Sequence, residues 1–268
     1  MDTKTFEGYK SLMYDRAGIA LNEGKDTLVS ARLGKRMRAL GISDHKEYLQ
    51  YALDHENEGE ITQVLDAICT NFTNFYRESD HFDLLEEAVE GWISAGQRRF
   101  RIWSAACSSG EEPYSMAVSL LKVSADRNLD MKILATDLST KILQKARAGR
   151  YEKEKVKPVP PLLREKYFQK ILEGRKTTFY QAGDVLKGMI SFRGINLSAP
   201  PFPMQGPLDI VFCRNVMIYF DNEVRSRLIN EIYRLTRPGG YLMVGHSESL
   251  AGITTDFKVV RPSVYLKQ

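Results

Sequence analysis

Two adjacent glutamates, Glu111 and Glu112, follow a turn of small residues, 105–110, that comes directly after a short apolar segment. Small side chains in such a turn let a ligand approach the backbone closely. Two carboxylates repel phosphate groups and attract an ammonium or sulfonium group, so the pattern favours S-adenosylmethionine over NAD or ATP. We expect Glu111 to face the ligand's amino group and Glu112 to face the start of the next helix. An ordinary strand-to-helix loop is the alternative, because a turn with one glycine is not a GxGxxG fingerprint.

Polar residues also follow two later apolar segments. Asp137 ends one of them and suits a ribose diol, with a helix N-cap as the alternative. Arg214 and Asn215 follow the other, and Tyr219 stands a few positions later. Because the carboxyl ends of parallel strands meet at one edge of a sheet, we expect these side chains to line the ligand site. A loop salt bridge for Arg214 and a core position for Tyr219 are the alternatives.

Two features of the first 80 residues indicate further interactions. The stretch TNFTNFYRE, residues 70–78, combines small polar side chains with three aromatic rings and an arginine, a density that a plain linker does not need. A packed linker is the alternative. One short predicted helix carries the basic residues Arg32, Lys35, Arg36 and Arg38. They fit a docking surface for an acidic partner, although a solvated face is the commoner outcome.

The spacing of apolar residues predicts only helices up to about residue 95 and alternating strands and helices from residue 100 onward. Strands are expected at 101–104, 131–136, 208–213 and 241–245. Helices are expected at 113–122, 140–147 and 223–236, the last with Asp221 or Asn222 as its N-cap. This alternation predicts a mostly parallel sheet that is covered by helices.

Residues from about 150 to 190 interrupt the alternation. They begin with a basic, proline-rich stretch, continue with a predicted short helix at 162–172 and include a predicted strand at 177–182. We therefore expect a small insertion on the main sheet. The last residues, 258–266, have the pattern of a hairpin.

The composition is that of a folded protein, with 43% hydrophobic residues and a net charge of +4. No apolar run approaches the roughly 20 residues of a membrane span, and no signal-peptide core is present. Cys69, Cys107 and Cys213 are far apart, which predicts reduced thiols, a cytoplasmic location and no metal site. The acidic balance of residues 1–80 argues against binding to nucleic acid.

Six segments together closely resemble the CheR family, the chemotaxis receptor glutamate methyltransferases. They are TNFTNFYRE, WSAACSSGEEPYSMA, ILATDLS, ISFRGINL, DIVFCRNVMIYFD and RPGGYLMVGHSES. The resemblance extends over essentially the whole chain. It implies a class I S-adenosylmethionine methyltransferase domain, with a Rossmann-like α/β sheet, at residues 81–268. It also implies an inserted β-subdomain at about 150–190 and an all-helical, receptor-facing domain at 1–80.

The resemblance further implies methyl transfer from S-adenosylmethionine to glutamate side chains on the cytoplasmic helices of chemoreceptors. The products would be glutamate methyl esters and S-adenosylhomocysteine. The positions implied for cofactor binding are Asn71, Thr73, Arg77, Glu111, Asp137, Asn196, Leu197, Arg214 and Asn215. The resemblance also places Tyr219 in the site. For catalysis we expect Arg77 to position the acceptor carboxylate and Tyr219 to lie beside the methyl group. The helix with Arg32, Lys35, Arg36 and Arg38 corresponds to the family's receptor-facing helix.

One stretch departs from part of the family. Some members hold a receptor's C-terminal pentapeptide on a glycine-rich loop of the β-subdomain, but LEGRKTTFYQAGDVLKG has only scattered glycines, so we expect no such tether. The residues alone leave open methyl transfer to RNA or another protein, and a non-catalytic sensor of the cofactor. The segment SAPPF, 198–202, is similar to an amino-group methyltransferase signature, but Ala199 has no oxygen to accept amine hydrogens.

Overall fold

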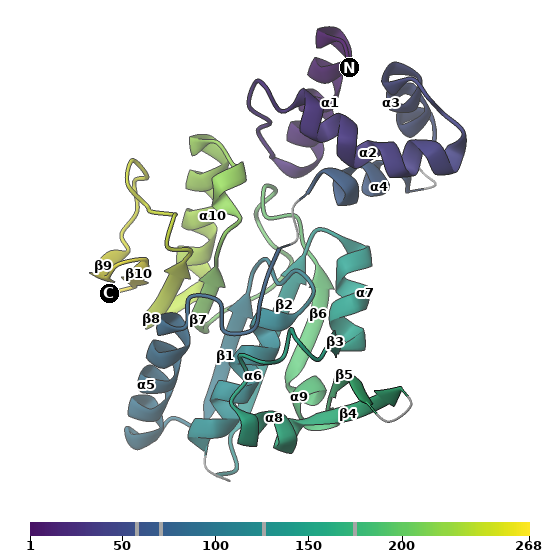
Figure 1. Cartoon of the computed structure of the whole chain (residues 1–268). Coiled ribbons are helices and arrows are strands. Elements are labelled where there is room, and N and C mark those ends of the chain that lie inside the picture. Colours follow the sequence, from purple (N-terminus) through teal and green to yellow (C-terminus); the bar gives the residue numbers. More distant parts are fainter. Residues whose placement is uncertain (57–58, 70–71, 125–126, 174–175) are drawn as a thin grey trace.

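The computed structural model describes residues 1–268 except 57–58, 70–71, 125–126 and 174–175. Its first helices are α1 (Thr3–Ala17), α2 (Asp26–Leu40), α3 (His45–Asp54) and α4 (Glu60–Ile68). They lie together beyond one end of the sheet (Figure 1). They have an apolar core of their own, which includes the fully buried side chains of Tyr9, Met13, Val29, Leu33, Tyr48 and Val64.

Local signals begin and end these helices. The side chain of Asp2 accepts a hydrogen bond of 2.9 Å from the backbone N–H of Thr5, which caps the start of α1. Gly18 ends α1 in the left-handed conformation, with φ of 67°, which glycine adopts without the usual steric cost. Asp44 caps α3 in the same way as Asp2 caps α1.

A seven-stranded sheet forms the centre of the second part of the chain. Its strands in spatial order are β6 (Ile190–Gly194), β2 (Asp130–Asp137), β1 (Arg99–Ser104), β7 (Leu208–Cys213), β8 (Thr236–Val244), β10 (Val264–Leu266) and β9 (Lys258–Arg261). The pairs among the first five strands are parallel, and β10 is antiparallel to both of its neighbours. The carboxyl ends of five strands therefore lie at one edge, where the order of the strands reverses next to β1.

Helices cover both faces of this sheet, which therefore separates two apolar cores. One core contains the buried faces of α5 (Asp80–Ser94) and α6 (Glu111–Ser124), and the other contains that of α10 (Asn222–Leu235). Side chains alternate between the faces of a strand, so in β1 Ile102 lies in the first core and Trp103 in the second. Both are almost inaccessible to solvent, which agrees with the continuous apolar run of a parallel strand.

The insertion after α7 (Thr140–Ala148) is a separate three-stranded antiparallel sheet. Its strands are β3 (Arg150–Glu152), β5 (Lys176–Ala182) and β4 (Phe168–Glu173), in spatial order. They lie together at the side of the molecule away from α10 (Figure 1). Two short helices complete the insertion, α8 (Pro161–Tyr167) before β4 and α9 (Asp184–Met189) after β5.

The predicted fold class is confirmed, and most differences concern short elements. The hairpin at the end of the chain is present as β9 and β10. The predicted helix at 162–172 is wrong in its second half, because the chain turns at Phe168 and pairs as β4 with β5. The sequence patterns did not indicate α3, α9 or β6, which are short and obtain much of their stability from packing.

The turn before α6 yields a prediction about stability. Gly110 has φ of +97°, and a Cβ there would lie 2.7 Å from Tyr151 Oη and 3.0 Å from Ala146 Cβ. We expect Gly110→Ala to lower the free energy of unfolding, measured by urea denaturation, by about 1–3 kcal/mol. Gly91→Ala is the matched control. Gly91 lies within α5 with nothing near its missing Cβ, so the change should raise stability by about 0.5–1 kcal/mol. An equal effect at both positions would contradict the argument.

Candidate active site

A cavity of about 270 Å³ lies between the helices of the first part and the carboxyl edge of the sheet. Its walls come from α1, the loop to α2, α2 itself, the segment after α4, and the loops that follow β1, β2, β6 and β7. A crevice at the carboxyl ends of parallel strands is where α/β proteins bind their ligands. The cavity therefore combines a standard sheet-edge site with a second wall from the helical part.

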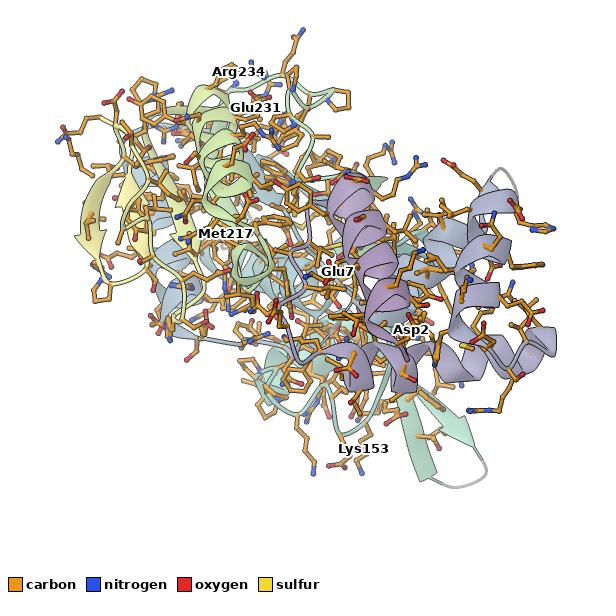
Figure 2. The ribbon with its side chains drawn as sticks, turned by 90° about the horizontal axis from the view of Figure 1, so that it is seen from above. Asp2, Glu7, Lys153, Met217, Glu231 and Arg234 are labelled. Carbon is orange, nitrogen blue, oxygen red and sulfur yellow. The ribbon has the colours of Figure 1, made fainter. Side chains whose placement is uncertain are left out.

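Hydrogen bonds hold the helical part against the sheet edge. Tyr14 of α1 donates to the carboxylate of Asp221, the N-cap of α10, at 2.6 Å. The amide of Asn196 donates to the backbone carbonyl of Arg16 at 2.9 Å. Seen from above, α1 with Asp2 and Glu7 lies beside the segment that carries Met217 (Figure 2). These contacts give the cavity two walls that are distant in sequence.

The two adjacent glutamates point in different directions, and not as expected. Glu112 lines the cavity, and its carboxylate accepts a hydrogen bond of 2.7 Å from Ser104 Oγ. Glu111 is fully buried outside the lining, where Lys155 Nζ lies 2.7 Å from one carboxylate oxygen and Ser109 donates to the other at 2.6 Å. Of the two side chains, Glu112 therefore faces the cavity, whereas the sequence pattern favoured Glu111. The helix begins at Glu111, and a rotation of about 100° per residue separates the two side chains.

Arg214 joins three segments at the floor of the cavity. Its guanidinium lies 3.2 Å from Glu78 Oε2 and 3.6 Å from Glu112 Oε2, and it also donates to the backbone carbonyl of Arg77. The side chain is almost fully buried. Burial raises the pKa of Glu112, and the nearby guanidinium opposes this shift. For Glu78, burial is outweighed by Arg214 and the Asn215 amide, so the pKa of Glu78 lies below its usual value.

A second buried carboxylate, Glu248, holds the loop that follows β7. It accepts backbone N–H bonds from Asn215 and Gly245 at 2.7 Å and from Ile218 at 3.3 Å. Asn215 has φ of +57°, a conformation that few residues other than glycine adopt without cost. Burial raises the pKa of Glu248, while these N–H groups oppose the shift. Glu248 therefore fixes the backbone from which Arg214 and Asn215 enter the cavity wall.

Asp137 lies at the end of β2 and lines the cavity. Its carboxylate accepts backbone N–H bonds from Ser108 at 2.9 Å and from Ser139 at 3.0 Å. Burial raises the pKa of Asp137 although both bonds favour the charged form. The N-cap of α7 is Ser139, whose side chain accepts from Ile142, so the alternative of Asp137 as that cap is wrong.

The segment between α4 and α5 contributes Thr73 and Arg77 to the lining. Arg77 donates from its guanidinium to the backbone carbonyl of Phe72 at 3.0 Å and is one-third exposed. Tyr76 and Glu78, on either side of it, have positive φ values of 53° and 55°. Asn71 lies outside the described residues.

The remaining predicted residues of the cavity are Asn196, Leu197 and Tyr219, and all three line it. The carboxamide oxygen of Asn196 accepts from the backbone and hydroxyl of Ser198, which leaves its amide for Arg16. Tyr219 belongs to the short helix η2 (Met217–Tyr219), and its backbone carbonyl accepts from Ala20 at 2.9 Å.

The four basic residues of α2 differ in their surroundings. Arg32 lines the cavity and donates to the backbone carbonyl of Ile68. Arg36 pairs with the buried carboxylate of Glu60. Lys35 and Arg38 are exposed. Two of the four predicted docking residues thus have other contacts within the helical part, because α2 packs against α4.

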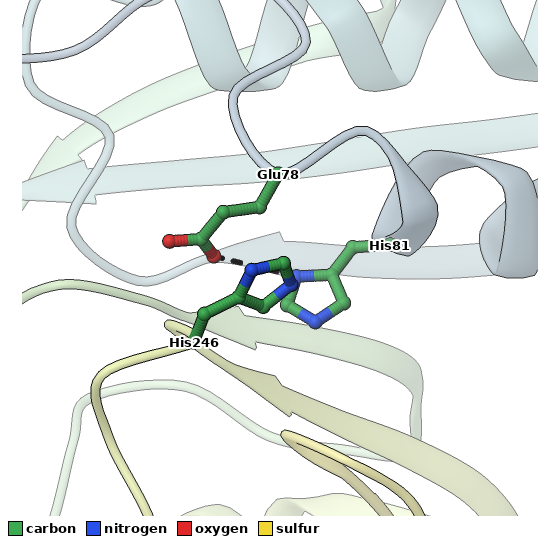
Figure 3. Close-up of side chains that lie close together, drawn as sticks. All are labelled: Glu78, His81 and His246. Atoms are coloured by element: carbon green, nitrogen blue, oxygen red, sulfur yellow. Dashed lines mark ion pairs between the residues drawn. The ribbon is translucent and has the colours of Figure 1, made fainter.

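Two histidines, His81 and His246, lie beside Glu78 (Figure 3). His81 Nδ1 is 3.7 Å from Glu78 Oε2, and the Nε2 of His246 is 3.1 Å from the Asp80 carboxylate. Burial and the nearby Arg214 lower the pKa of His81 to about 4, so His81 is neutral at pH 7. Ligand atoms of Glu78, His81 and His246 lie within 4.8 Å of one another. The Arg214 guanidinium already occupies this carboxylate and disfavours a second cation. The absence of a metal site stays a prediction.

Sequence reasoning missed one group of residues that line the cavity and one residue that holds its wall in place. One is the wall from α1 and α2, which includes Met13, Leu28 and Val29. No signal marked it, because apolar residues on a helix look the same whether they face a core or a ligand. The other is Glu248, which lies in the quoted segment RPGGYLMVGHSES but received no role.

Fold and site together define a methyltransferase of the Rossmann-like class with a binding site for S-adenosylmethionine. Comparison with known families agrees. Residues 71–266 match the S-adenosylmethionine-binding domain of CheR methyltransferases, and residues 4–69 match their all-alpha domain. The chain belongs to the CheR methyltransferase family.

Curated relatives span nearly the same length. The chain is 35% identical over 260 residues to the chemotaxis protein methyltransferase of Escherichia coli K12, covering 97% of this chain and 89% of that protein. It is 37% identical over 262 residues to chemotaxis protein methyltransferase 2 of Pseudomonas aeruginosa, covering 97% and 91%. It is 35% identical over 263 residues to the corresponding protein of Borreliella burgdorferi, covering 96% and 91%.

The contacts of Glu248 yield a prediction. Glutamine would present an NH2 group to backbone donors that now bond to carboxylate oxygens, so Glu248→Gln should lower the free energy of unfolding by about 1–3 kcal/mol. Urea denaturation measures this change. Glu223→Gln, which removes an exposed pair with Arg227 on α10, is the control and should change stability by less than about 0.5 kcal/mol. Equal small losses would show that the loop after β7 does not depend on Glu248.

Proposed function

We propose that this protein transfers a methyl group from S-adenosylmethionine to glutamate side chains of chemoreceptors. The products are glutamate methyl esters and S-adenosylhomocysteine. The observation that carries the proposal is the cavity at the carboxyl edge of the sheet, with the carboxylates of Glu112 and Asp137 in its wall, in a chain of the CheR methyltransferase family. Relatives of nearly equal length are chemotaxis protein methyltransferases.

The residues of the cavity fit the methyl donor. Glu112, with one oxygen held by Ser104, suits the ammonium group of the methionyl part. Asp137 suits the ribose hydroxyls, and the buried Leu197 with Asn196 suits the adenine. The small side chains of Ala105, Ala106 and Ser108 leave room for the ligand. Thr73, Asn215 and Arg214 complete the proposed set, in which Glu112 replaces Glu111.

The bound donor supplies an activated methyl group, and the chain's residues orient the acceptor. A glutamate with a pKa near ~4.3 is already ionised at pH 7, so its oxygen attacks without a general base. A carboxylate is a weak nucleophile in water because it is well solvated, so the cavity must exclude water and align the oxygen with the methyl group. Alignment of this kind contributes on the order of 7–11 kcal/mol in favourable cases. We assign carboxylate positioning to Arg77 and the place beside the methyl group to Tyr219.

The partner is the methyl-accepting helical region of a chemoreceptor. We propose that residues 1–80 form a receptor-facing domain, that residues 81–268 form the methyltransferase domain, and that Lys35 and Arg38 contact the receptor. None of the helices in the described part of the chain combines the length and apolar character that crossing a bilayer requires. A cytoplasmic location and the lack of a pentapeptide tether remain predictions, and residues 174–175 of the relevant stretch lie outside the described ones.

Transfer of labelled methyl from S-adenosylmethionine to chemoreceptor-containing membranes, followed by treatment with base, tests the function. We expect label on the receptor that leaves as methanol, because carboxylate methyl esters hydrolyse readily. Base-stable label would overturn the acceptor and indicate methylation of nitrogen or carbon. Bound cofactor without transfer to any receptor would favour a sensor.

The two glutamates provide a matched pair for the cofactor. Glu112→Gln should raise the dissociation constant for S-adenosylmethionine roughly 10- to 100-fold, because a charge-assisted hydrogen bond is lost. Glu111→Gln, buried outside the lining, should change it less than about threefold. Isothermal titration calorimetry measures both. The opposite ranking would return the amino-group role to Glu111.

The raised pKa of Glu112 adds a pH dependence. The carboxylate binds an ammonium group only when it is charged, so cofactor affinity should fall as the pH is lowered through this raised pKa, at a higher pH than for an ordinary glutamate. The Glu112→Gln variant lacks the titrating group and should show a flatter profile over the same range. If cofactor affinity depended on pH in the same way in the wild type and in Glu112→Gln, a group other than Glu112 would cause the dependence.

Arg77→Ala tests the catalytic assignment. Loss of the residue that orients the acceptor should lower kcat by roughly tenfold or more, while the dissociation constant for the cofactor changes by less than about threefold. Single-turnover methylation measures the rate of methyl transfer, and calorimetry measures the dissociation constant for the cofactor. Abolished cofactor binding would make Arg77 a cofactor-binding residue only.

A further inference from the structure

The insertion is bonded to the turn that leads into α6. We call residues 105–110 the cofactor turn, because part of this turn lines the cavity. Tyr151 of β3 donates from its hydroxyl to the backbone carbonyl of Ser109 at 2.8 Å. Lys155, in the loop after β3, places its Nζ 2.7 Å from Glu111 Oε1, while the Ser109 hydroxyl donates to Oε2 of the same carboxylate at 2.6 Å. Two side chains of the insertion thus reach the end of the cofactor turn.

The backbone of the cofactor turn needs such support. Ser108 and Gly110 have positive φ values of 47° and 97°. The N–H of Cys107 donates to the carbonyl of Thr136 at 2.8 Å, and that of Ser108 donates to the Asp137 carboxylate. Conformations of this kind persist only where surrounding contacts enforce them. The end of β2 therefore holds one side of the turn, and the insertion holds the other.

The insertion also packs against the segment that carries Arg77. The ring of Phe75 lies edge to face with that of Tyr151, with 4.9 Å between the ring centres, and with that of Phe168, at 5.8 Å. Phe75 stands between Thr73 and Arg77, both of which line the cavity. All three rings are buried in one apolar core. The insertion therefore contacts the two segments that we assign to the methyl donor and to the acceptor carboxylate.

The two halves of the ion pair differ in their access to water. The Glu111 side chain has no exposed surface, whereas the Lys155 side chain is 44% exposed. Loss of the lysine charge would leave a carboxylate buried without its partner, which is costly. Loss of the carboxylate charge would leave an ammonium group that can turn towards solvent. The pair therefore predicts unequal effects of its two single substitutions.

We propose that Lys155 and Tyr151 are positioning residues, through which the insertion holds the cofactor turn in the shape that receives S-adenosylmethionine. Lys155 neutralises the buried Glu111 at the start of α6, and Tyr151 fixes the carbonyl of the preceding turn. Neither residue touches the donor. The inference rests on the proposed function only for the methyl donor, and it holds for any acceptor.

Substitutions of the ion pair test this role by calorimetry. Lys155→Met should raise the dissociation constant for S-adenosylmethionine roughly tenfold, because the unpaired Glu111 displaces the turn. Lys155→Arg keeps the charge and should bind within about threefold of the wild type, as should the double variant Lys155→Met/Glu111→Gln, in which no unpaired charge remains. Lys157→Met is the matched control. Lys157 lies two residues away and pairs with the exposed Glu154, so its loss should leave the constant unchanged.

A second matched pair tests the hydroxyl. Tyr151→Phe removes the bond to Ser109 and should raise the dissociation constant roughly three- to tenfold. Tyr114→Phe removes a bond of the same kind, from a buried hydroxyl to the backbone carbonyl of Ala146 in α7. It should change the constant by less than about twofold, although both variants lose a hydrogen bond.

A contribution to folding alone would give different results. If Lys155→Met became easier to unfold in urea but bound S-adenosylmethionine as tightly as the wild type, the positioning role would be overturned. Failure of the added Glu111→Gln change to restore binding would overturn it as well, because the loss would then not come from an unpaired carboxylate.

Hydrogen–deuterium exchange without any ligand separates this inference from the proposed function. Peptides that cover the cofactor turn should exchange faster in Lys155→Met than in the wild type, and at the wild-type rate in Lys157→Met and in the double variant. Faster exchange without methyl transfer to any receptor would support the positioning role and contradict the proposed function alone. Equal exchange in all four proteins would overturn the positioning role, whatever the methylation assay gives.

Discussion

The buried guanidinium of Arg214 is the contact on which the site depends. It lies between Glu78 of the segment after α4 and Glu112 of α6, and it donates to the backbone carbonyl of Arg77. Without a cation between them, two carboxylates in a low-dielectric setting would repel each other and take up protons. Breaking such a pair on one side is costly, because the partner charge stays buried. One side chain therefore joins the segment between α4 and α5, the start of α6 and the end of β7.

Strained backbone surrounds this charge cluster, and carboxylates hold it. Tyr76, Glu78, Ser108 and Asn215 all have positive φ values. Glu248 binds the backbone N–H of Asn215, and Asp137 binds that of Ser108. Residues in such conformations persist only where surrounding contacts enforce them, and they are typical of functional sites. Acidic side chains thus have two roles here. Glu112 lines the cavity, and Glu248 and Asp137 bind the backbone of the loops that form its wall.

The helical part adds what the sheet cannot provide. The loops at the carboxyl edge form only one wall of the cavity, and α1 and α2 supply the other through the contacts of Tyr14 and Asn196. This arrangement brings Lys25 and Leu28 of the helical part, both exposed, to the cavity. The proposed methyl donor and the proposed acceptor then meet between two parts of the chain with separate apolar cores.

The sequence by itself determined the alternation of the longer strands and helices, the presence of an insertion, an N-cap at Asp221 or Asn222, and the family. These follow from apolar periodicity, capping residues and motif spacing, which are local properties. Only the tertiary structure decided which glutamate faces the cavity, because Lys155 binds Glu111 from 44 residues away. It likewise placed Arg32 in the cavity wall and gave Glu248 its bonds to the loop after β7. Side-chain direction at a helix start depends on packing with distant segments, which no local pattern encodes.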